Sequence, residues 1–232
     1  MVSGMPAGAR VTHSMKITLY LDVISSWCFW ATPAWHRLKE RFGGRVEFAW
    51  KIALMDAGGL PVSVAQLAWF YRRSEALTGA DVQLSTGWFE AGRPEYLEPN
   101  AVVEAAKDFG ITDDRVREAL ARATVIEGRR TGELAEAVRI AVTAVPELNA
   151  TALRERAQSE EVLQRMRAAT AEFHALAVSQ RPAFVLENAI GDRAVLSGLT
   201  SAEPLIALVE TMLADETAQA EYGGRFGPPP QG

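Results

Sequence analysis

Residues 22–29 read Asp-Val-Ile-Ser-Ser-Trp-Cys-Phe and join a strand to a helix. Upstream, over residues 16–23, apolar and polar side chains alternate, which is typical of a strand with one buried face. Downstream, over residues 27–41, apolar residues recur at helical spacing. The sequence therefore predicts one helix that begins directly at the carboxyl end of the first strand.

The segments on either side predict an α/β order of elements. A Gly-Gly pair ends the first helix, and alternation over residues 46–54 predicts a second strand, parallel to the first with a right-handed crossover. Residues 183–197 alternate around a turn and predict a hairpin. A last helix is expected from Thr200 to about residue 214, because Thr200 and Glu203 have capping-box spacing.

Residues 62–178 differ in character, because amphipathic helical segments follow one another there between glycines and prolines. We predict five to seven helices that form one compact insertion over a cleft beside the first helix. The aromatic residues of the insertion are expected mainly in its core, with some lining the cleft: Trp69, Phe70, Tyr71, Trp88, Phe89 and Tyr96. The predicted organisation is a disordered extension at 1–15, an α/β part at 16–60, the helical insertion at 61–178, a second α/β part at 179–216 and a flexible tail at 217–232.

The composition excludes several classes of partner. With 232 residues, 48% of them hydrophobic, the chain can bury a sizeable core. Its net charge of −5 includes no basic stripe, so a small-molecule partner is expected rather than nucleic acid or a membrane surface. Residues 1–14 lack the apolar stretch of a signal peptide, and no apolar run of membrane-spanning length follows, so we expect a cytoplasmic protein. A homodimer remains open.

One cysteine and three isolated histidines restrict the chemistry further. Cys28 has no partner for an intrachain disulfide, and a cysteine-rich metal site is excluded by count, so no metal is expected. The glycine pairs form no phosphate-binding loop, so no nucleotide cofactor is expected either.

Ser25 and Cys28 are the candidate catalytic residues. They lie three residues apart at the start of the helix, which is the spacing of a Cys-x-x-Cys redox pair with its first cysteine replaced by serine. Free backbone N–H groups and the helix dipole stabilise a thiolate or another anion at such a junction. The alternatives are that Ser25 only caps the helix and that Cys28 packs as a small buried hydrophobe.

These residues resemble the active-site entry of the DsbA-like thioredoxin family, including its FrnE-like members, in which an Asp-x-x-Cys-Pro-Trp-Cys pattern opens the first helix. Residues 181–185, Arg-Pro-Ala-Phe-Val, resemble the cis-proline strand of that family. The resemblance covers most of residues 15–215. It implies a thioredoxin-like fold with a large all-helical insertion, and a cis bond between Arg181 and Pro182 beside Ser25.

Branches with serine at the first position include kappa-class glutathione transferases and 2-hydroxychromene-2-carboxylate isomerases, whose serine faces bound glutathione. Ser25 matches that serine and Trp27 matches an aromatic residue of their motif, whereas Ser26 replaces a proline. Cys28 is similar to the disulfide-exchanging branch instead. The resemblance implies glutathione or a similar low-molecular-weight thiol as cofactor, with Ser25 donating a hydrogen bond to its thiolate.

The resemblance adds further candidates for binding thiol or substrate beside Pro182. Lys51 matches a basic residue of the family, and the alternative is a snorkelling lysine. Arg181 replaces a small or aliphatic residue, and it either holds a substrate carboxylate or is a solvated surface arginine. Thr200 and Ser201 correspond to the segment that holds the γ-glutamyl end of glutathione, without its aspartate.

Three functions follow as competing hypotheses. The first is a thiol-dependent enzyme that isomerises or conjugates a small electrophile. The second is a monothiol oxidoreductase that acts through mixed disulfides of Cys28, and the third is a non-catalytic binding module. Disulfide exchange by two cysteines of this chain is excluded, because serine at position 25 removes the attacking thiolate.

Overall fold

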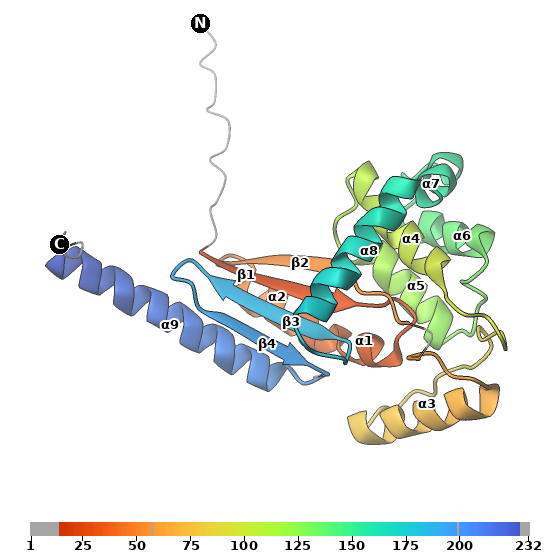
Figure 1. Ribbon diagram of the computed structural model, residues 1–232, viewed down its shortest axis with the longest axis horizontal. Helices are drawn as coiled ribbons and strands as arrows, with labels where there is room; N and C mark the ends of the chain where they lie inside the picture. Colours follow the sequence, from red (N-terminus) through yellow and green to blue (C-terminus); the bar gives the residue numbers. More distant parts are fainter. Residues whose placement is uncertain (1–13, 57, 199, 228–232) are drawn as a thin grey trace, which may run out of the picture.

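Four strands form one mixed sheet in the order β2-β1-β3-β4 (Figure 1). β1 (Met15–Leu21) pairs in parallel with β2 (Val46–Ile52) and antiparallel with β3 (Ala183–Asn188). β3 pairs antiparallel with β4 (Arg193–Ser197). The predicted order of a strand, helix, strand unit and a later hairpin is confirmed.

The structure is a computed structural model that describes residues 14–56, 58–198 and 200–227. Met15, the last residue of the predicted N-terminal extension, already belongs to β1. The rest of that extension, apart from Ser14, lies outside the described residues, as do the last five residues of the predicted tail.

Nine α-helices and one 3₁₀ helix surround the sheet within the described residues. Their bounds are α1 Ser26–Trp30, α2 Thr32–Phe42, α3 Val64–Thr78, α4 Leu97–Ala106, η1 Lys107–Phe109, α5 Arg115–Val125, α6 Leu134–Ala144, α7 Ala150–Ala157, α8 Glu160–Ala175 and α9 Ala202–Phe226. The six α-helices from α3 to α8 agree with the predicted five to seven. In the part of the chain that the structure describes, none of the helices is long and apolar enough to cross a membrane.

The first helix is interrupted at Ala31, where the sequence predicts one continuous helix. The N–H of Ala31 caps α1 by donating to the carbonyls of Trp27 and Phe29, and its carbonyl accepts from the N–H of Trp35 at 3.0 Å. Pro33, near the start of α2, has no N–H to continue the α1 ladder. The prediction of one continuous helix is therefore wrong at this point.

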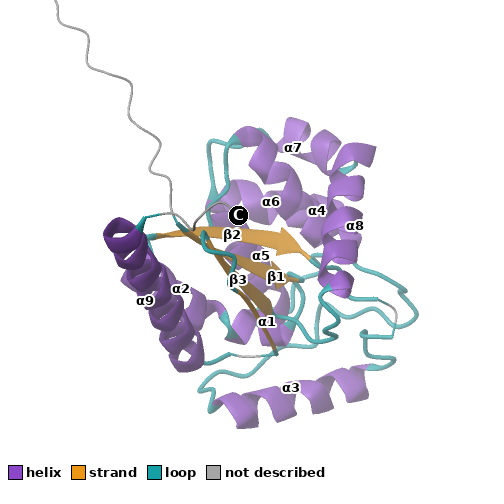
Figure 2. Cartoon of the chain, turned by 60° about the vertical axis from the view of Figure 1, so that its left-hand side comes forward, coloured by secondary structure: helices purple, strands orange, loops and turns teal. Residues whose placement is uncertain are grey.

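The alternation in β1 sends its side chains into two layers. Ile17 and Leu19 pack in one hydrophobic cluster with Trp35 of α2, whereas Tyr20 packs in another with Phe173 of α8. α2 and α9 lie side by side on the face of the sheet that carries Ile17 and Leu19. α8 contacts β2 on the opposite face, which carries Tyr20 (Figure 2). The sheet is thus covered on both faces.

The helical insertion contributes residues to three hydrophobic clusters, including the one that holds Phe173. Helices α4 to α8 join the cluster that contains the sheet, and Val102 and Leu120 are fully buried there. α3 covers a second cluster, which includes Leu67 and Tyr71, and lies apart from α4 to α8 in both views (Figures 1 and 2). Residues 79–96 form no helix and connect α3 to the other helices, so the helices of the insertion pack in more than one group. That residues 61–178 form one domain stays a prediction.

α9 begins later than the sequence predicts. Ser201 is its N-cap and makes no side-chain capping hydrogen bond. Glu203 instead forms an ion pair with Arg37 of α2, with 2.6 Å between the charged atoms. The predicted capping box between Thr200 and Glu203 is therefore wrong, because a tertiary partner takes the glutamate.

α9 also continues to Phe226, through much of the segment 217–232 that the sequence predicts to be a flexible tail. Glu216 accepts hydrogen bonds from the Ser14 hydroxyl at 2.6 Å and from the Ala189 N–H at 2.9 Å. Farther along α9, the rings of Tyr222 and Phe226 pack with centroids 4.6 Å apart. These contacts support the helix across its glycine pair.

The shared cluster predicts that the sheet and helices α4 to α8 unfold together. We expect Leu120→Ala to lower the free energy of unfolding by about 2–5 kcal/mol, because truncation of a fully buried leucine leaves a cavity. Denaturation followed by circular dichroism and by tryptophan fluorescence should give one transition with coincident midpoints. Leu77→Ala is the control, since Leu77 of α3 is exposed and its loss should change stability by no more than about 0.5 kcal/mol. Two separate transitions would contradict a single shared core.

Candidate functional site

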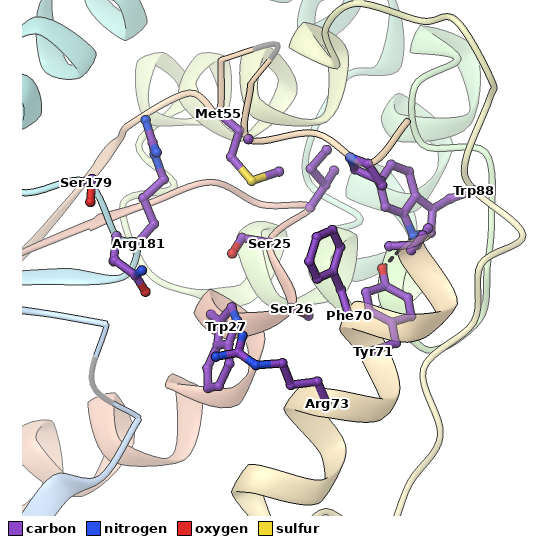
Figure 3. Close-up of a pocket in the computed structure, with 15 residues that line it drawn as sticks. Ser25, Ser26, Trp27, Met55, Phe70, Tyr71, Arg73, Trp88, Ser179 and Arg181 are labelled. Atoms are coloured by element: carbon purple, nitrogen blue, oxygen red, sulfur yellow. Dashed lines mark hydrogen bonds between the residues drawn. The ribbon is translucent and has the colours of Figure 1, made fainter. Parts of the chain in front are cut away.

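A pocket of about 260 Å³ lies beyond the carboxyl end of β1, between α1, α3 and the segment that precedes β3 (Figure 3). Its lining comes from the turn after β1 (Ile24, Ser25, Ser26, Trp27), from the segment after β2 (Met55, Gly59, Pro61), from α3 and the loop after it (Leu67, Phe70, Tyr71, Arg73, Trp88) and from the segment before β3 (Ser179, Gln180, Arg181). Four segments that are distant in the sequence therefore meet at one site.

Ser25 lines this pocket and caps α1 at the same time. Its backbone is extended, with φ −74° and ψ 121°, and its Oγ accepts a hydrogen bond from the N–H of Cys28 at 3.4 Å. Accepting that bond leaves the hydroxyl hydrogen available to a ligand. The predicted capping role and a role toward a ligand are therefore compatible. Ser26 and Trp27 line the same pocket.

Cys28 faces the protein core. Its side chain belongs to the hydrophobic cluster of the sheet, it is only 6% exposed, and it is absent from the pocket lining. Burial raises the pKa of the Cys28 thiol to about 11. A thiol in this state is a poor nucleophile, because only the thiolate attacks.

Asp22, at the end of β1, is the buried charge behind the pocket. Its carboxylate accepts hydrogen bonds from the Met55 N–H at 2.8 Å, the Asn100 side-chain amide at 2.9 Å and the Ile24 N–H at 3.1 Å. Asn100 in turn accepts from the Val23 N–H at 3.0 Å. Burial raises the pKa of the Asp22 carboxyl above its ordinary value, against the opposing effect of these donors.

The bond between Arg181 and Pro182 is cis, and the Arg181 side chain lines the pocket while it is held by contacts within the protein. Its guanidinium donates to the backbone carbonyls of Ala53 at 2.6 Å and Leu54 at 2.5 Å, and it lies 4.4 Å from the centroid of the Phe173 ring. β2 ends at Ile52 and not at the predicted residue 54. The carbonyls of the next two residues accept hydrogen bonds from Arg181. Arg181 thus ties the end of β2 to the start of β3.

Three predicted binding residues and the cis proline lie outside the pocket lining. Lys51 is paired in register with Tyr20, so it lies on the α8 face of the sheet, where its ammonium group binds Glu172. Thr200 and Ser201 precede α9 and are not among the lining residues, and neither is Pro182, which is buried. The structure therefore brings Ser25, Ser26, Trp27 and Arg181 together and leaves the other candidates apart.

Helix α3 supplies the wall opposite the cis-proline segment. Phe70, Tyr71 and Arg73 project from it, and the Tyr71 hydroxyl accepts a hydrogen bond from the indole N–H of Trp88 at 2.7 Å (Figure 3). The guanidinium carbon of Arg73 lies 5.8 Å from the centroid of the Trp27 ring. Some aromatic residues of the insertion therefore line the cleft, as the sequence predicts.

Sequence reasoning gave no role to Asp22, Asn100 or Arg73. An acidic residue at the end of a strongly apolar strand is a signal that could have identified Asp22 as buried and in need of donors. Asn100 and Arg73 carry no comparable signal, because the residues that they contact, Asp22 and Trp27, are remote from them in the sequence. Arg73 does lie three residues from Phe70, which places both on one face of the helix.

Comparison with known proteins identifies the family. A family model described as a DSBA-like thioredoxin domain matches residues 16–210, so the chain belongs to this family and has its thioredoxin-like fold. The cytosolic disulfide reductase DsbM from Pseudomonas aeruginosa is 21% identical, with a TM-score of 0.69 over 86% of this chain and 98% of that one. The structure of DsbM with GSH gives 20% identity, a TM-score of 0.69 and coverage of 86% and 99%.

A more distant similarity extends to DsbA from Pseudomonas aeruginosa, with 12% identity, a TM-score of 0.57 and coverage of 94% of this chain and 91% of that one. No curated protein matches the sequence. The family to which the chain belongs is one of thiol oxidoreductases, yet this chain carries serine at the first position of the pair.

The burial of Cys28 predicts slow reaction with thiol reagents in the folded protein. With a pKa of about 11, only about one thiol in a thousand is ionised at about pH 8, and the sulfur is also shielded. We expect colour development with 5,5′-dithiobis(2-nitrobenzoate) to be slow until guanidinium chloride unfolds the chain. Ser201→Cys is the control, because its new thiol is exposed at the start of α9 and should react rapidly. Fast labelling of the parent would show that Cys28 is accessible.

The raised pKa of Asp22 predicts a specific pH dependence of stability. The folded protein retains the Asp22 proton at pH values where the unfolded chain has released it, so this contribution is present at low pH and is lost as the pH rises through the folded-state pKa. We expect the difference in unfolding free energy between the parent and Asp22→Asn to fall as the pH rises from about 4. Urea denaturation across a pH series measures this difference, with Asp215→Asn as a control for loss of one exposed carboxylate. A difference that increases with pH would contradict the burial argument.

Proposed function

We propose that this protein is a thiol-dependent enzyme that binds glutathione or a similar low-molecular-weight thiol in the Ser25 pocket and uses it to isomerise or conjugate a small electrophile. The observation that carries the proposal is the opposite placement of two neighbouring side chains. Both residues are largely shielded from solvent, but Ser25 lines the pocket, whereas Cys28 packs in the core cluster of the sheet and does not line it.

The proposed chemistry assigns Ser25 to stabilise a thiolate. The ligand thiol loses its proton to water, because no acidic or histidine side chain is present among the described residues that line the pocket. The Ser25 hydroxyl then donates a hydrogen bond to the sulfur. In conjugation, the sulfur lone pair forms a bond to the electrophilic carbon, and the leaving group departs with its bonding electrons. In isomerisation, the thiolate adds and is later eliminated, so that it is regenerated.

The segment before β3 supplies the second side of the proposed thiol site. Ser179, Gln180 and Arg181 line the pocket beside Ser25, and the cis bond follows directly. Backbone N–H and carbonyl groups beside a pocket can pair with the peptide groups of a bound tripeptide. The similarity to DsbM, which is known in complex with GSH and is described as cytosolic, also supports glutathione as the thiol and a cytoplasmic location.

Burial of Cys28 argues against the monothiol alternative. A mixed disulfide requires access for an attacking sulfur and a reactive thiolate, and the raised pKa of Cys28 and its place in the core oppose both. A protein that binds thiols without turnover is the remaining alternative, and activity measurements on electrophiles distinguish it from the enzyme.

The proposal predicts that Ser25→Ala weakens glutathione binding far more than Cys28→Ala does. A hydrogen bond to a charged sulfur contributes about 1.5–3 kcal/mol, so we expect a loss of about ten- to a hundredfold in affinity. Isothermal titration calorimetry with glutathione measures this for the parent and both variants. Thermal melting serves as a control, since Ser25→Ala also removes a helix cap and costs about 0.5–2 kcal/mol of stability. If Cys28→Ala abolished activity and Ser25→Ala were neutral, the monothiol mechanism would replace this one.

A further inference from the structure

The charged side chains that line the pocket are all of one sign. Arg73 and Arg181 are the two cationic side chains among its described lining residues, and no aspartate or glutamate is present there. The rest of the lining is largely apolar or aromatic, with serines concentrated near α1. Such a surface favours a ligand that combines an apolar body with an anionic group.

The two arginines differ in whether their guanidinium groups are already engaged. Arg181 donates to the carbonyls of Ala53 and Leu54 and stacks on Phe173, so its position is fixed by the protein. Arg73 makes no ion pair and no side-chain hydrogen bond with any other residue that the structure describes. Its contact is with the Trp27 ring, at 5.8 Å from the centroid. Arg73 therefore retains all its donors for a ligand.

The direction of Arg73 also suits a ligand in the pocket. Figure 3 shows its side chain reaching from α3 toward Trp27, next to Phe70 and across from Ser25. A guanidinium offers a planar pair of donors that matches a carboxylate. The neighbouring Arg72 carries the same charge on the same helix and is also exposed, but it does not line the pocket.

We infer that Arg73 is the anion-binding residue of this pocket, and that it holds a ligand carboxylate above Trp27 while the apolar part of the ligand lies against Phe70 and Met55. The inference rests on the proposed function only for the position of the reacting sulfur beside Ser25. The carboxylate belongs either to the bound thiol or to the electrophile, and the two sources require separate measurements.

The first experiment needs no thiol and uses two naphthalene probes of similar shape. We expect the parent to bind 2-naphthoate about three- to tenfold more tightly than the neutral 2-naphthalenemethanol, as calorimetry measures. Arg73→Gln should remove this preference, and Arg73→Lys should retain part of it. Added salt should weaken the preference in the parent, because the guanidinium is exposed.

Arg72→Gln is the matched control, since it removes the same charge from the same helix and should leave the preference unchanged. The inference is overturned if Arg73→Gln binds both probes as the parent does, or if Arg72→Gln gives the same loss. Equal melting temperatures of the parent and the two glutamine variants exclude a folding effect.

The second experiment identifies the source of the carboxylate with glutathione and its diethyl ester, which keeps the thiol. If Arg73→Gln weakens binding of glutathione and not of the ester, the thiol supplies the carboxylate. If it weakens 2-naphthoate and not glutathione, the electrophile supplies it. Both results support the inference. Failure of the parent to bind glutathione at all would overturn the proposed function, while the naphthoate preference would still test Arg73.

Discussion

The buried carboxylate of Asp22 is the contact on which the site depends. It ends β1 and accepts hydrogen bonds from three different segments: the adjoining turn at Ile24, the segment after β2 at Met55, and helix α4 at Asn100. A buried carboxylate is costly unless such donors surround it, so the three segments must come together for the fold to form. One side chain thereby joins the α/β part to the insertion directly behind the pocket.

This arrangement explains why two residues at redox spacing have different environments. The turn held by Asp22 leaves Ser25 in extended backbone, so its side chain lies at the pocket and folds back to cap α1. Cys28 is already helical and packs into the core with the sheet. The position that lines the pocket thus carries serine and not cysteine, which is why the proposed function takes its sulfur from a ligand thiol.

Much of the fold follows from local sequence patterns. Period-two alternation identified the strands, helical spacing identified the insertion, and residues 22–29 together with 181–185 indicated the family and the cis bond. The break at Ala31 was also within reach, because Pro33 cannot donate a backbone hydrogen bond. The length of α9 was not, because Glu216 meets Ser14 and Ala189 only after folding.

By itself, then, the sequence determined the order of strands and helices and the strand–helix junction at Ser25, because these depend on residues within a few positions of one another. The cis proline was expected from the family resemblance. Only the tertiary structure decided what the charged side chains do. Lys51 and Arg181 were candidates for ligand binding, yet one binds Glu172 and the other binds backbone carbonyls. Arg73 attracted no notice in the sequence and lines the pocket unpaired among the described residues. A charged side chain takes its role from whichever partner the fold places beside it, and no local pattern encodes that partner.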